Sequence, residues 1–264
     1  MTLVLSPQED RIQKNGGKII FGFQNGKSRV QKIYDSFSEG KSYVDVQRAQ
    51  YFTESFKETE GQPLTLRWAK ALYHIAEKID VYIEPDQLIV GRVGRPGKYG
   101  LIYPELDGCF LESFVHQAND RTESPFEVDE KDVNIIETEI APYWKDKTYY
   151  DDLSQSFPED VLKVTYDPKD RYSSRYIVNE SSAWRSALQW VHDYKKGIDE
   201  GFLAIKEQAA DAISRLDDMN PEDTIDKKAF YEAVQITCDA IILWAHRHSV
   251  EAKRLADLEH DPSR

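Results

Sequence analysis

Residues 48–91 read RAQYFTESFKETEGQPLTLRWAKALYHIAEKIDVYIEPDQLIVG, and this stretch decides the fold class of the chain. It begins with a helical pattern rich in Glu and Lys. Gly61 and Pro63 end that helical pattern, so a new element is expected to begin after them. A second amphipathic helix is then expected over residues 64–79, before a short apolar run. The stretch therefore predicts a helix, a turn, a second helix and a short strand-like segment.

The segments on either side extend this helical pattern. Ser42 is expected to cap the first helix, which then covers residues 43–59. Upstream, residues 28–37 place apolar side chains at helical spacing, whereas the glycine-containing residues 1–27 are expected to form a poorly anchored leader. Downstream, residues 81–100 are expected to form a strand, a turn, a second strand and a loop rich in glycine and proline.

Long helices are expected to dominate the second half of the chain. Residues 131–144 are amphipathic. Residues 181–216 form one long helical pattern, although Gly197 and Gly201 weaken its middle. An Asn-Pro-Glu sequence ends it, and residues 224–259 form a second long helical pattern, so the two would make an αα-hairpin. The expected fold class of this segment is mainly α.

The middle of the last helical pattern points to a larger body. Residues 236–245 are apolar on most sides. A helix that is apolar all round normally lies inside a bigger structure, and few strands are available here to cover it. We therefore expect residues 28–264 to be the helical part of a larger domain that this chain does not complete.

The composition argues against several functional classes. The 264 residues carry a formal net charge of −13 and are 40% hydrophobic, which is typical of a soluble globular protein without a basic surface for nucleic acid. Cys109 and Cys238 lack the spacing of a disulfide framework or a metal site, which favours a reducing cytoplasm. The first residues do not look like a signal peptide, and no apolar run approaches the ~18 residues of a membrane span.

Most candidate reactive groups have a simpler structural interpretation. No histidine lies within six residues of Cys109 to activate it, so Cys109 and Cys238 are both interpreted as structural. His246 and His248 are two residues apart, so on a helix they point in different directions and cannot chelate one metal. The sequence contains no HExxH, Walker, GxGxxG or Ser–His–Asp signature. We expect no metal site and no bound cofactor.

The strongest candidate site is Arg185 together with Gln189. They are four residues apart, so on a helix both side chains project from one face, and His192 lies on nearly the same stripe. A guanidinium fork beside an amide donor suits an anion that has several oxygens. The alternative is an ordinary solvated pair of polar side chains, which the spacing alone favours.

Several separated blocks of sequence resemble the start of the pyruvate formate-lyase-like glycyl radical enzymes. The resemblance covers about residues 28–264 and rests on blocks in the family's order: RAQYFTESFKETEG (48–61), LRWAKALYHIAEKI (66–79), DQLIVGRVGRPG (86–97), IAPYWKDKTYYD (140–151) and TCDAIILWAHRHSVEAKRLA (237–256). Within the family, YIVNESSAWRSALQWVHDY (176–194) is similar to enzymes that cleave isethionate. Those enzymes bind the substrate sulfonate through an Arg and a Gln four residues later, a pair that Arg185 and Gln189 match.

This resemblance implies a fold and a chemistry for the parent enzyme. The chain would supply outer helices of a ten-stranded α/β barrel and one wall of its pocket. A radical S-adenosylmethionine activase would install a glycyl radical, a cysteine thiyl and a glutamate base would act on isethionate, and acetaldehyde and sulfite would form. The implied partners are a small organosulfonate, the activase and a second copy in a homodimer. The implied location is the cytoplasm or a bacterial microcompartment.

The chain also departs from the family pattern. It contains neither the Cys-x-Glu catalytic loop nor the late loop resembling RVxGY, and Cys109 with Glu112 forms Cys-x-x-Glu too early in the sequence. No catalytic residue is therefore expected in this chain, and Arg185 and Gln189 would only orient the substrate. Two alternatives stay open: a 2,3-dihydroxypropane-1-sulfonate sulfite-lyase, and a non-catalytic helical interaction module. The apolar residues 236–245 argue against the module, because they would be exposed in isolation.

Overall fold

The computed structural model describes residues 11–15, 18–22, 27–85, 87–106, 115–122, 125–161, 166–167, 170–174 and 192–260. The first half of this part contains the hairpin strands β1 (Arg11–Asn15) and β2 (Lys18–Gly22), then α1 (Arg29–Glu39), β3 (Ser42–Asp45), α2 (Gln47–Glu58), α3 (Leu64–Lys78) and β4 (Lys98–Leu101). The rest contains η1 (Ala118–Asp120), β5 (Phe126–Glu127), α5 (Glu130–Ile135), η2 (Ile136–Ile140), α6 (Ala141–Trp144), α7 (Tyr149–Ser156), β6 (Tyr166–Asp167), β7 (Asp170–Ser174), α10 (Tyr194–Asp199), α11 (Gly201–Ser214), η4 (Asp223–Lys227) and α12 (Lys228–Leu258). The expectation of a mainly helical segment is confirmed.

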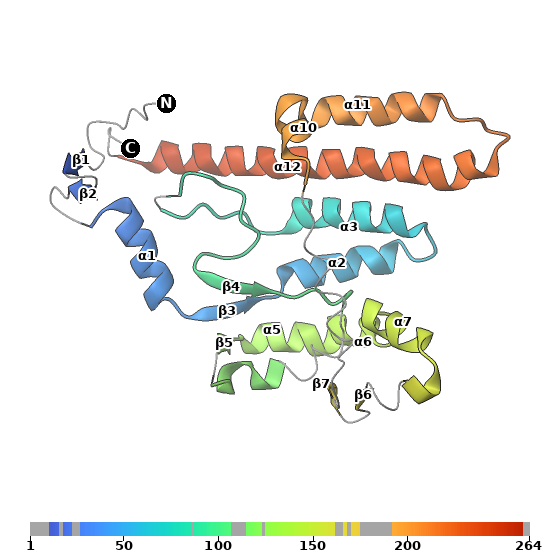
Figure 1. The fold of residues 1–264 in the computed structure, drawn as a ribbon, viewed down its shortest axis with the longest axis horizontal. Helices are drawn as coiled ribbons and strands as arrows, with labels where there is room; N and C mark the ends of the chain where they lie inside the picture. The colour runs from blue at the N-terminus through green and yellow to red at the C-terminus, as the bar shows by residue number, and fades with distance from the viewer. Residues whose placement is uncertain are drawn as a thin grey trace.

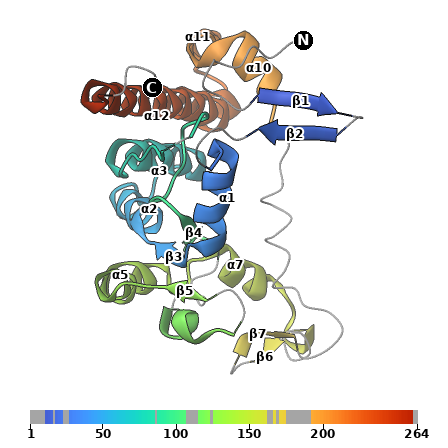
Figure 2. The same cartoon turned by 90° about the vertical axis from the view of Figure 1, so that its left-hand side faces the viewer.

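Four helices lie side by side and form the main body. Figures 1 and 2 show α11, α12, α3 and α2 stacked in this order, with the strands β3 and β4 next to α2 and with α5 beyond them. The predicted hairpin is present in part: α12 is long, whereas α11 covers only Gly201–Ser214 of the first predicted helix. Lys206 on α11 binds the carboxylate of Asp239 on α12 at 2.6 and 2.8 Å. Helix α12 therefore lies between α11 and α3, so these two helices flank the predicted apolar residues 236–245, of which Ala245 is exposed.

The segment just before α2 is strand β3 of a small parallel sheet, although the sequence pattern predicts a helix there. Its strand order is β4-β3-β5, and β3 is parallel to both neighbours. The predicted helical start at residue 43 is therefore wrong, because residues 42–45 pair with residues 98–101. The carboxylate of Asp45 then accepts a hydrogen bond from the backbone N–H of Gln47 at 3.1 Å. That bond satisfies one of the free donors at the start of α2, so Asp45 takes the capping role expected of Ser42.

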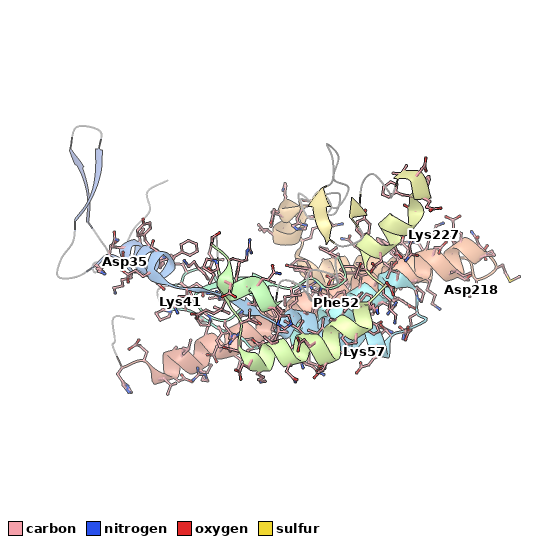
Figure 3. The ribbon with its side chains drawn as sticks, turned by 90° about the horizontal axis from the view of Figure 1, so that it is seen from below. Asp35, Lys41, Phe52, Lys57, Asp218 and Lys227 are labelled. Atoms are coloured by element: carbon pink, nitrogen blue, oxygen red, sulfur yellow. The ribbon has the colours of Figure 1, made fainter. Side chains whose placement is uncertain are left out.

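An aromatic cluster joins α2 to its neighbours. Phe52 and Phe56 stack with ring centroids 4.4 Å apart, and Trp144 of α6 lies 5.8 Å from Phe52 and 5.3 Å from Phe56. Trp68 of α3 meets the Phe52 ring edge to face at 5.1 Å. Figure 3 shows Phe52 in the packed centre of the molecule. Contacts of this geometry contribute beyond the burial of apolar area, so the cluster fixes α2, α3 and α6 as one unit.

The helix that carries Trp144 contains a π-helical turn. Helix α5 leads into η2, whose hydrogen bonds are of the π type, and α6 follows without a break. Pro142 stands in the first turn of α6 and has no N–H, so the regular ladder of α-helical bonds cannot run through this point. Both Ile136 and Ile140 are fully buried, which ties the irregular turn to the core.

Two other boundaries differ from the sequence expectation. The two strands that were expected before the loop are absent from residues 81–85 and 87–97. The strand of this region is β4, which begins at Lys98 inside the predicted loop. The single helix expected over residues 181–216 is also wrong within residues 192–216, which the structure describes. Asp193 lies outside helical geometry and caps α10, and Gly201 has φ = +77°, which separates α10 from α11. The predicted poorly anchored leader includes the β1–β2 hairpin, and its anchoring stays a prediction.

A buried hydrogen bond offers a first test of the aromatic cluster. The indole Nε1 of Trp144 donates to the hydroxyl of Thr53 at 2.8 Å, and this hydroxyl donates to the carbonyl of Ala49 at 2.7 Å. Thr53→Val keeps the shape of the side chain but leaves the buried indole N–H without an acceptor. We expect it to lower the free energy of unfolding by about 1–3 kcal/mol in urea denaturation.

Thr138 supplies the matched control. Its exposed hydroxyl makes the same kind of bond, to the carbonyl of Asn134 at 2.7 Å, and no indole depends on it. Thr138→Val should therefore change the free energy of unfolding by no more than about 0.5 kcal/mol. Equal losses for the two variants would contradict the role assigned to the bond between Trp144 and Thr53.

Candidate functional site

The predicted anion clamp lies outside the described residues. Arg185 and Gln189 belong to the part of the chain for which no placement is given, so their pairing stays a prediction. The described chain resumes at His192, whose carbonyl accepts from the N–H of Tyr194 at 2.9 Å. The next residue, Asp193, caps α10 by accepting from the N–H of Lys196 at 3.0 Å. His192 is therefore not part of a helix that continues into α10, and its place on the predicted stripe is not supported.

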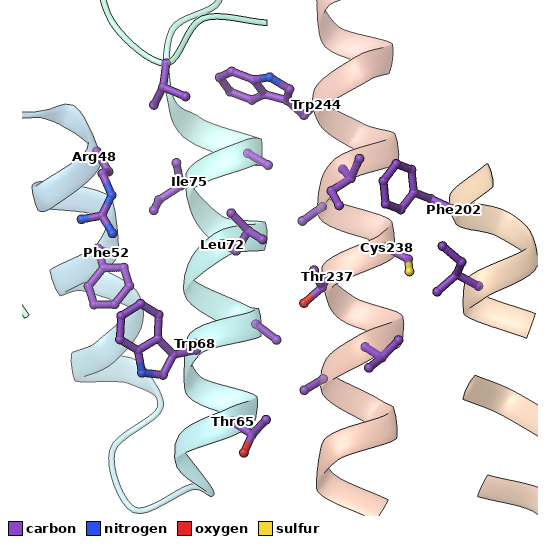
Figure 4. A pocket seen from close by; sticks show the side chains of 18 of the residues that line it. Arg48, Phe52, Thr65, Trp68, Leu72, Ile75, Phe202, Thr237, Cys238 and Trp244 are labelled. Atoms are coloured by element: carbon purple, nitrogen blue, oxygen red, sulfur yellow. The ribbon is translucent and has the colours of Figure 1, made fainter. Parts of the chain in front are cut away.

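The described residues contain an apolar cavity of about 710 Å³ between the helices. Figure 4 shows that its side chains come from α2, α3, α12 and α11. We call this feature the apolar cavity, and its lining includes Arg48, Phe52, Thr65, Trp68, Leu72, Ile75, Tyr103, Phe202, Phe230, Thr237, Cys238 and Trp244. Its volume lies in the range of small-molecule pockets, but few polar groups converge on it.

Arg48 is the one charged side chain among the residues that line the apolar cavity. Its guanidinium binds the carboxylate of Glu105 through two nitrogens, at 2.5 and 3.2 Å, and donates to the carbonyl of Ile102 at 3.2 Å. It also lies 3.9 Å from the ring centroid of Tyr103, a cation–π contact. Because Glu105 is only 5% exposed, the pair holds the loop after β4 onto α2 rather than offering a free anion site.

A second arginine joins three acidic residues at the end of β3. Arg95 lies 3.1 Å from the carboxylate of Asp132, 3.4 Å from Asp129 and 3.8 Å from Asp45, which is fully buried. The backbone N–H of Arg95 also donates to Asp45 at 3.0 Å. These contacts connect the loop before β4, which contains Arg95, to strand β3 and to the start of α5. Sequence reasoning did not assign a role to Arg95 or to Arg48, because their acidic partners are distant in the sequence.

Cys238, His74 and His248 have structural surroundings, which for Cys238 agrees with the sequence interpretation. Cys238 is buried, and burial raises the pKa of its thiol, which disfavours the reactive thiolate. His74 lies 3.0 Å from the carboxylate of Glu54, which links α3 to α2. His248 is buried, and its Nδ1 donates to the carbonyl of Trp244 at 2.9 Å. Cys109 lies outside the described residues.

The described residues contain neither a metal site nor a membrane-spanning helix. Among them, no group of three or more His, Cys, Asp or Glu side chains is placed to hold a metal ion. No helix in the same part of the chain is long and apolar enough to cross a membrane. The described structure thus offers scaffold contacts and the apolar cavity.

The family model described as "Pyruvate formate lyase-like" matches residues 23–264, and the chain therefore belongs to this family. It is 51% identical over 263 residues to an isethionate sulfite-lyase of Oleidesulfovibrio alaskensis, a match that covers 100% of this chain and 32% of that protein. The chain thus spans about a third of the length of the curated relatives it matches.

Solved structures agree with this assignment. The B12-independent glycerol dehydratase of Clostridium butyricum, in its glycerol-bound form, is 28% identical with a TM-score of 0.79, over 92% of this chain and 30% of that one. A glycyl radical enzyme of Archaeoglobus fulgidus is also 28% identical, with a TM-score of 0.74, over 89% of this chain and 29% of that one. The predicted resemblance to this family is confirmed, and its matched members include lyases and dehydratases of the glycyl radical class.

The buried pair of Arg48 and Glu105 allows a double-mutant test. Arg48→Met should lower the free energy of unfolding by about 3–5 kcal/mol, because it leaves the buried carboxylate of Glu105 without a counter-charge. Adding Glu105→Gln should restore much of the loss, which urea denaturation of the single and double variants would measure.

The exposed pair of Arg254 and Glu251, 2.7 Å apart, is the control. Arg254→Met should change the free energy of unfolding far less than Arg48→Met does, because solvent screens this pair. If Arg48→Met cost as little as Arg254→Met, the contact between α2 and the loop after β4 would not be a major support of the fold.

Asp132 predicts a specific dependence of stability on pH. Burial raises the pKa of its carboxyl above the ordinary value, although Arg95 acts in the opposite direction. The folded state therefore holds this proton more tightly than the unfolded state, so its contribution is full at low pH and is lost as pH rises through the raised pKa. Asp132→Asn has no carboxyl to titrate at this position, so it does not lose this contribution. The free energy of unfolding of Asp132→Asn relative to wild type should therefore increase as pH rises above about 4.

The comparison needs urea denaturation across a pH series. Asp129 faces the same arginine but has a side chain that is 68% exposed, so Asp129→Asn, measured alongside, controls for the loss of one carboxylate near Arg95. A difference between Asp132→Asn and wild type that stays constant with pH would contradict the raised pKa.

Proposed function

We propose that this chain is part of a glycyl radical enzyme that cleaves the C–S bond of isethionate to give acetaldehyde and sulfite. The observation that carries the proposal is the 51% identity, over the whole chain, to an isethionate sulfite-lyase. The Arg185 and Gln189 pair adds a physical reason, since its types and spacing suit a sulfonate with three oxygens.

The proposed role of this chain is to hold and orient the substrate. The Arg185 guanidinium would bind two sulfonate oxygens through its planar fork, and the Gln189 amide would donate to a further one. Fixing the sulfonate decides which carbon faces the reactive group, which is a positioning effect. Neither side chain transfers a proton, and the printed sequence holds neither the Cys-x-Glu nor the glycyl radical loop, so the catalytic residues lie outside it.

The proposal extends to the architecture and partners of the whole enzyme. The described helices would form an outer part of a ten-stranded α/β barrel. The glycyl radical would be installed by a radical S-adenosylmethionine activase, and the enzyme would act as a homodimer. Its location would be the cytoplasm or a bacterial microcompartment. These properties follow from the family and are proposed for the complete protein only.

A hybrid enzyme makes the proposal testable. Residues 1–264 would replace the matched 32% of the Oleidesulfovibrio alaskensis relative, giving a chain of full length. Arg185→Ala in this hybrid should lower kcat/KM for isethionate by at least about 100-fold, because the substrate is no longer held in position. Sulfite release gives the rate, and the glycyl radical signal in electron paramagnetic resonance should be unchanged.

Two further variants sharpen the result. Arg185→Lys keeps the charge but loses the fork, so it should retain only part of the activity. Arg215→Ala alters an exposed residue just beyond α11 and should leave kcat/KM unchanged. An unchanged kcat/KM in Arg185→Ala would exclude the clamp. A hybrid that carries the radical but does not cleave isethionate would exclude isethionate as the substrate.

A further inference from the structure

The two products of the proposed reaction react with each other in water. The sulfur lone pair of hydrogensulfite adds to the carbonyl carbon of acetaldehyde. A C–S bond forms, the π bond of the carbonyl breaks, and the carbonyl oxygen takes the proton of hydrogensulfite. The adduct is 1-hydroxyethane-1-sulfonate, and its formation needs no oxidant, reductant or enzyme. An enzyme that releases both products together therefore gives rise to this adduct in its own reaction mixture.

The adduct is a structural isomer of isethionate. Each molecule has a two-carbon chain, a hydroxyl group and a singly charged sulfonate. The hydroxyl group stands on the sulfonate-bearing carbon in the adduct and on the neighbouring carbon in isethionate, whereas the sulfonate itself is the same in both. A guanidinium fork with a nearby amide contacts the sulfonate oxygens alone. The predicted pair of Arg185 and Gln189 would therefore hold either isomer.

The adduct cannot follow the proposed reaction. To give acetaldehyde, the hydroxyl-bearing carbon of isethionate loses a hydrogen, and the C–S bond breaks on the neighbouring carbon. In the adduct the neighbouring carbon is a methyl group, which has no C–S bond to break. The adduct would therefore occupy the sulfonate site without turnover. A ligand that only competes with the substrate in this way raises the apparent KM and leaves kcat unchanged.

Two arginines of the described core already bind carboxylates. Arg48 bonds Glu105 through two nitrogens, at 2.5 and 3.2 Å, and Arg95 lies 3.1 Å from the carboxylate of Asp132. A sulfonate would have to displace these carboxylates to bind either guanidinium. The formal net charge of −13 also disfavours unspecific binding of an anion. Inhibition by the adduct is therefore expected at the sulfonate clamp, in competition with the substrate.

We propose that the enzyme is inhibited by the adduct of its own two products, which competes with isethionate for Arg185 and Gln189. This inference rests on the proposed function and adds a form of regulation to the same site. Because the addition is reversible, any reaction that removes acetaldehyde also dissolves the adduct and frees the clamp. Turnover thus depends on a second reaction, one that consumes the aldehyde.

The full-length hybrid described above gives the test. Initial rates are measured by NMR with ¹³C-labelled isethionate, so that unlabelled additives do not contribute to the signal. Adduct at about ten times the KM of isethionate should raise the apparent KM at least about threefold, with kcat unchanged. Sulfite alone and acetaldehyde alone, at the same concentration, are the matched controls and should raise it less. The glycyl radical signal in electron paramagnetic resonance should stay the same.

The variant Arg185→Lys tests where the adduct binds. Both the KM of isethionate and the inhibition constant of the adduct should rise in this variant, because both ligands lose the same planar fork. An inhibition constant that does not change would place the adduct at another site and overturn the inference. An apparent KM that the adduct leaves unchanged in the unmodified hybrid would overturn it as well, and so would equally strong inhibition by sulfite alone.

Progress curves give an independent check. The rate should fall earlier than the depletion of isethionate explains. An alcohol dehydrogenase with NADH, which reduces acetaldehyde to ethanol, should restore it. Curves that are the same with and without this removal would contradict the inference. A hybrid that does not cleave isethionate refutes the proposed function, whereas one that cleaves it but is not inhibited by the adduct refutes this inference alone.

Discussion

Phe52 lies where α2, α3 and α6 meet, and its ring contacts those of Phe56, Trp68 and Trp144. The other elements are arranged around this contact. Helix α12 packs on the far side of α3, α11 packs on α12, and β3 leads directly into α2. Dense packing of large rings permits little displacement, so the position of α3 and of the apolar cavity beside it follows from the burial of Phe52.

The helices were predictable where their cause is local. The turn at Gly61 and Pro63 and the helix from Leu64 follow from backbone preferences and apolar spacing, and both are present. Residues 43–45 were predicted as the start of a helix capped by Ser42, because their side chains also fit that spacing. They form a strand because residues 98–101 and 126–127 pair with them, and such distant pairing leaves little signal in a local pattern.

The residues of the candidate site likewise include some that the sequence indicates and others that only the tertiary fold brings together. The Arg185 and Gln189 pair was predicted from the family resemblance, because its spacing alone favours an ordinary solvated pair, and both its role and its geometry stay predictions. Arg48 and Arg95 could not be assigned, since Glu105, Asp45 and Asp132 reach them only through the tertiary fold. Residues 236–245, which were predicted to be apolar on most sides, contribute one wall of the apolar cavity. Another wall is α3, whose pattern alone predicts an ordinary amphipathic helix.

The π-helical turn at residues 136–140 has a consequence for tolerance to insertion and deletion. A π turn holds one residue more than an α turn, so it shifts the phase of everything that follows it in the same helix. Each residue of an α-helix rotates the side-chain direction by about 100°. Loss of one residue from this turn would therefore swing Trp144 away from Thr53, with no change in the chemistry of either side chain. The length of this segment, and not only its composition, is thus part of what specifies the core.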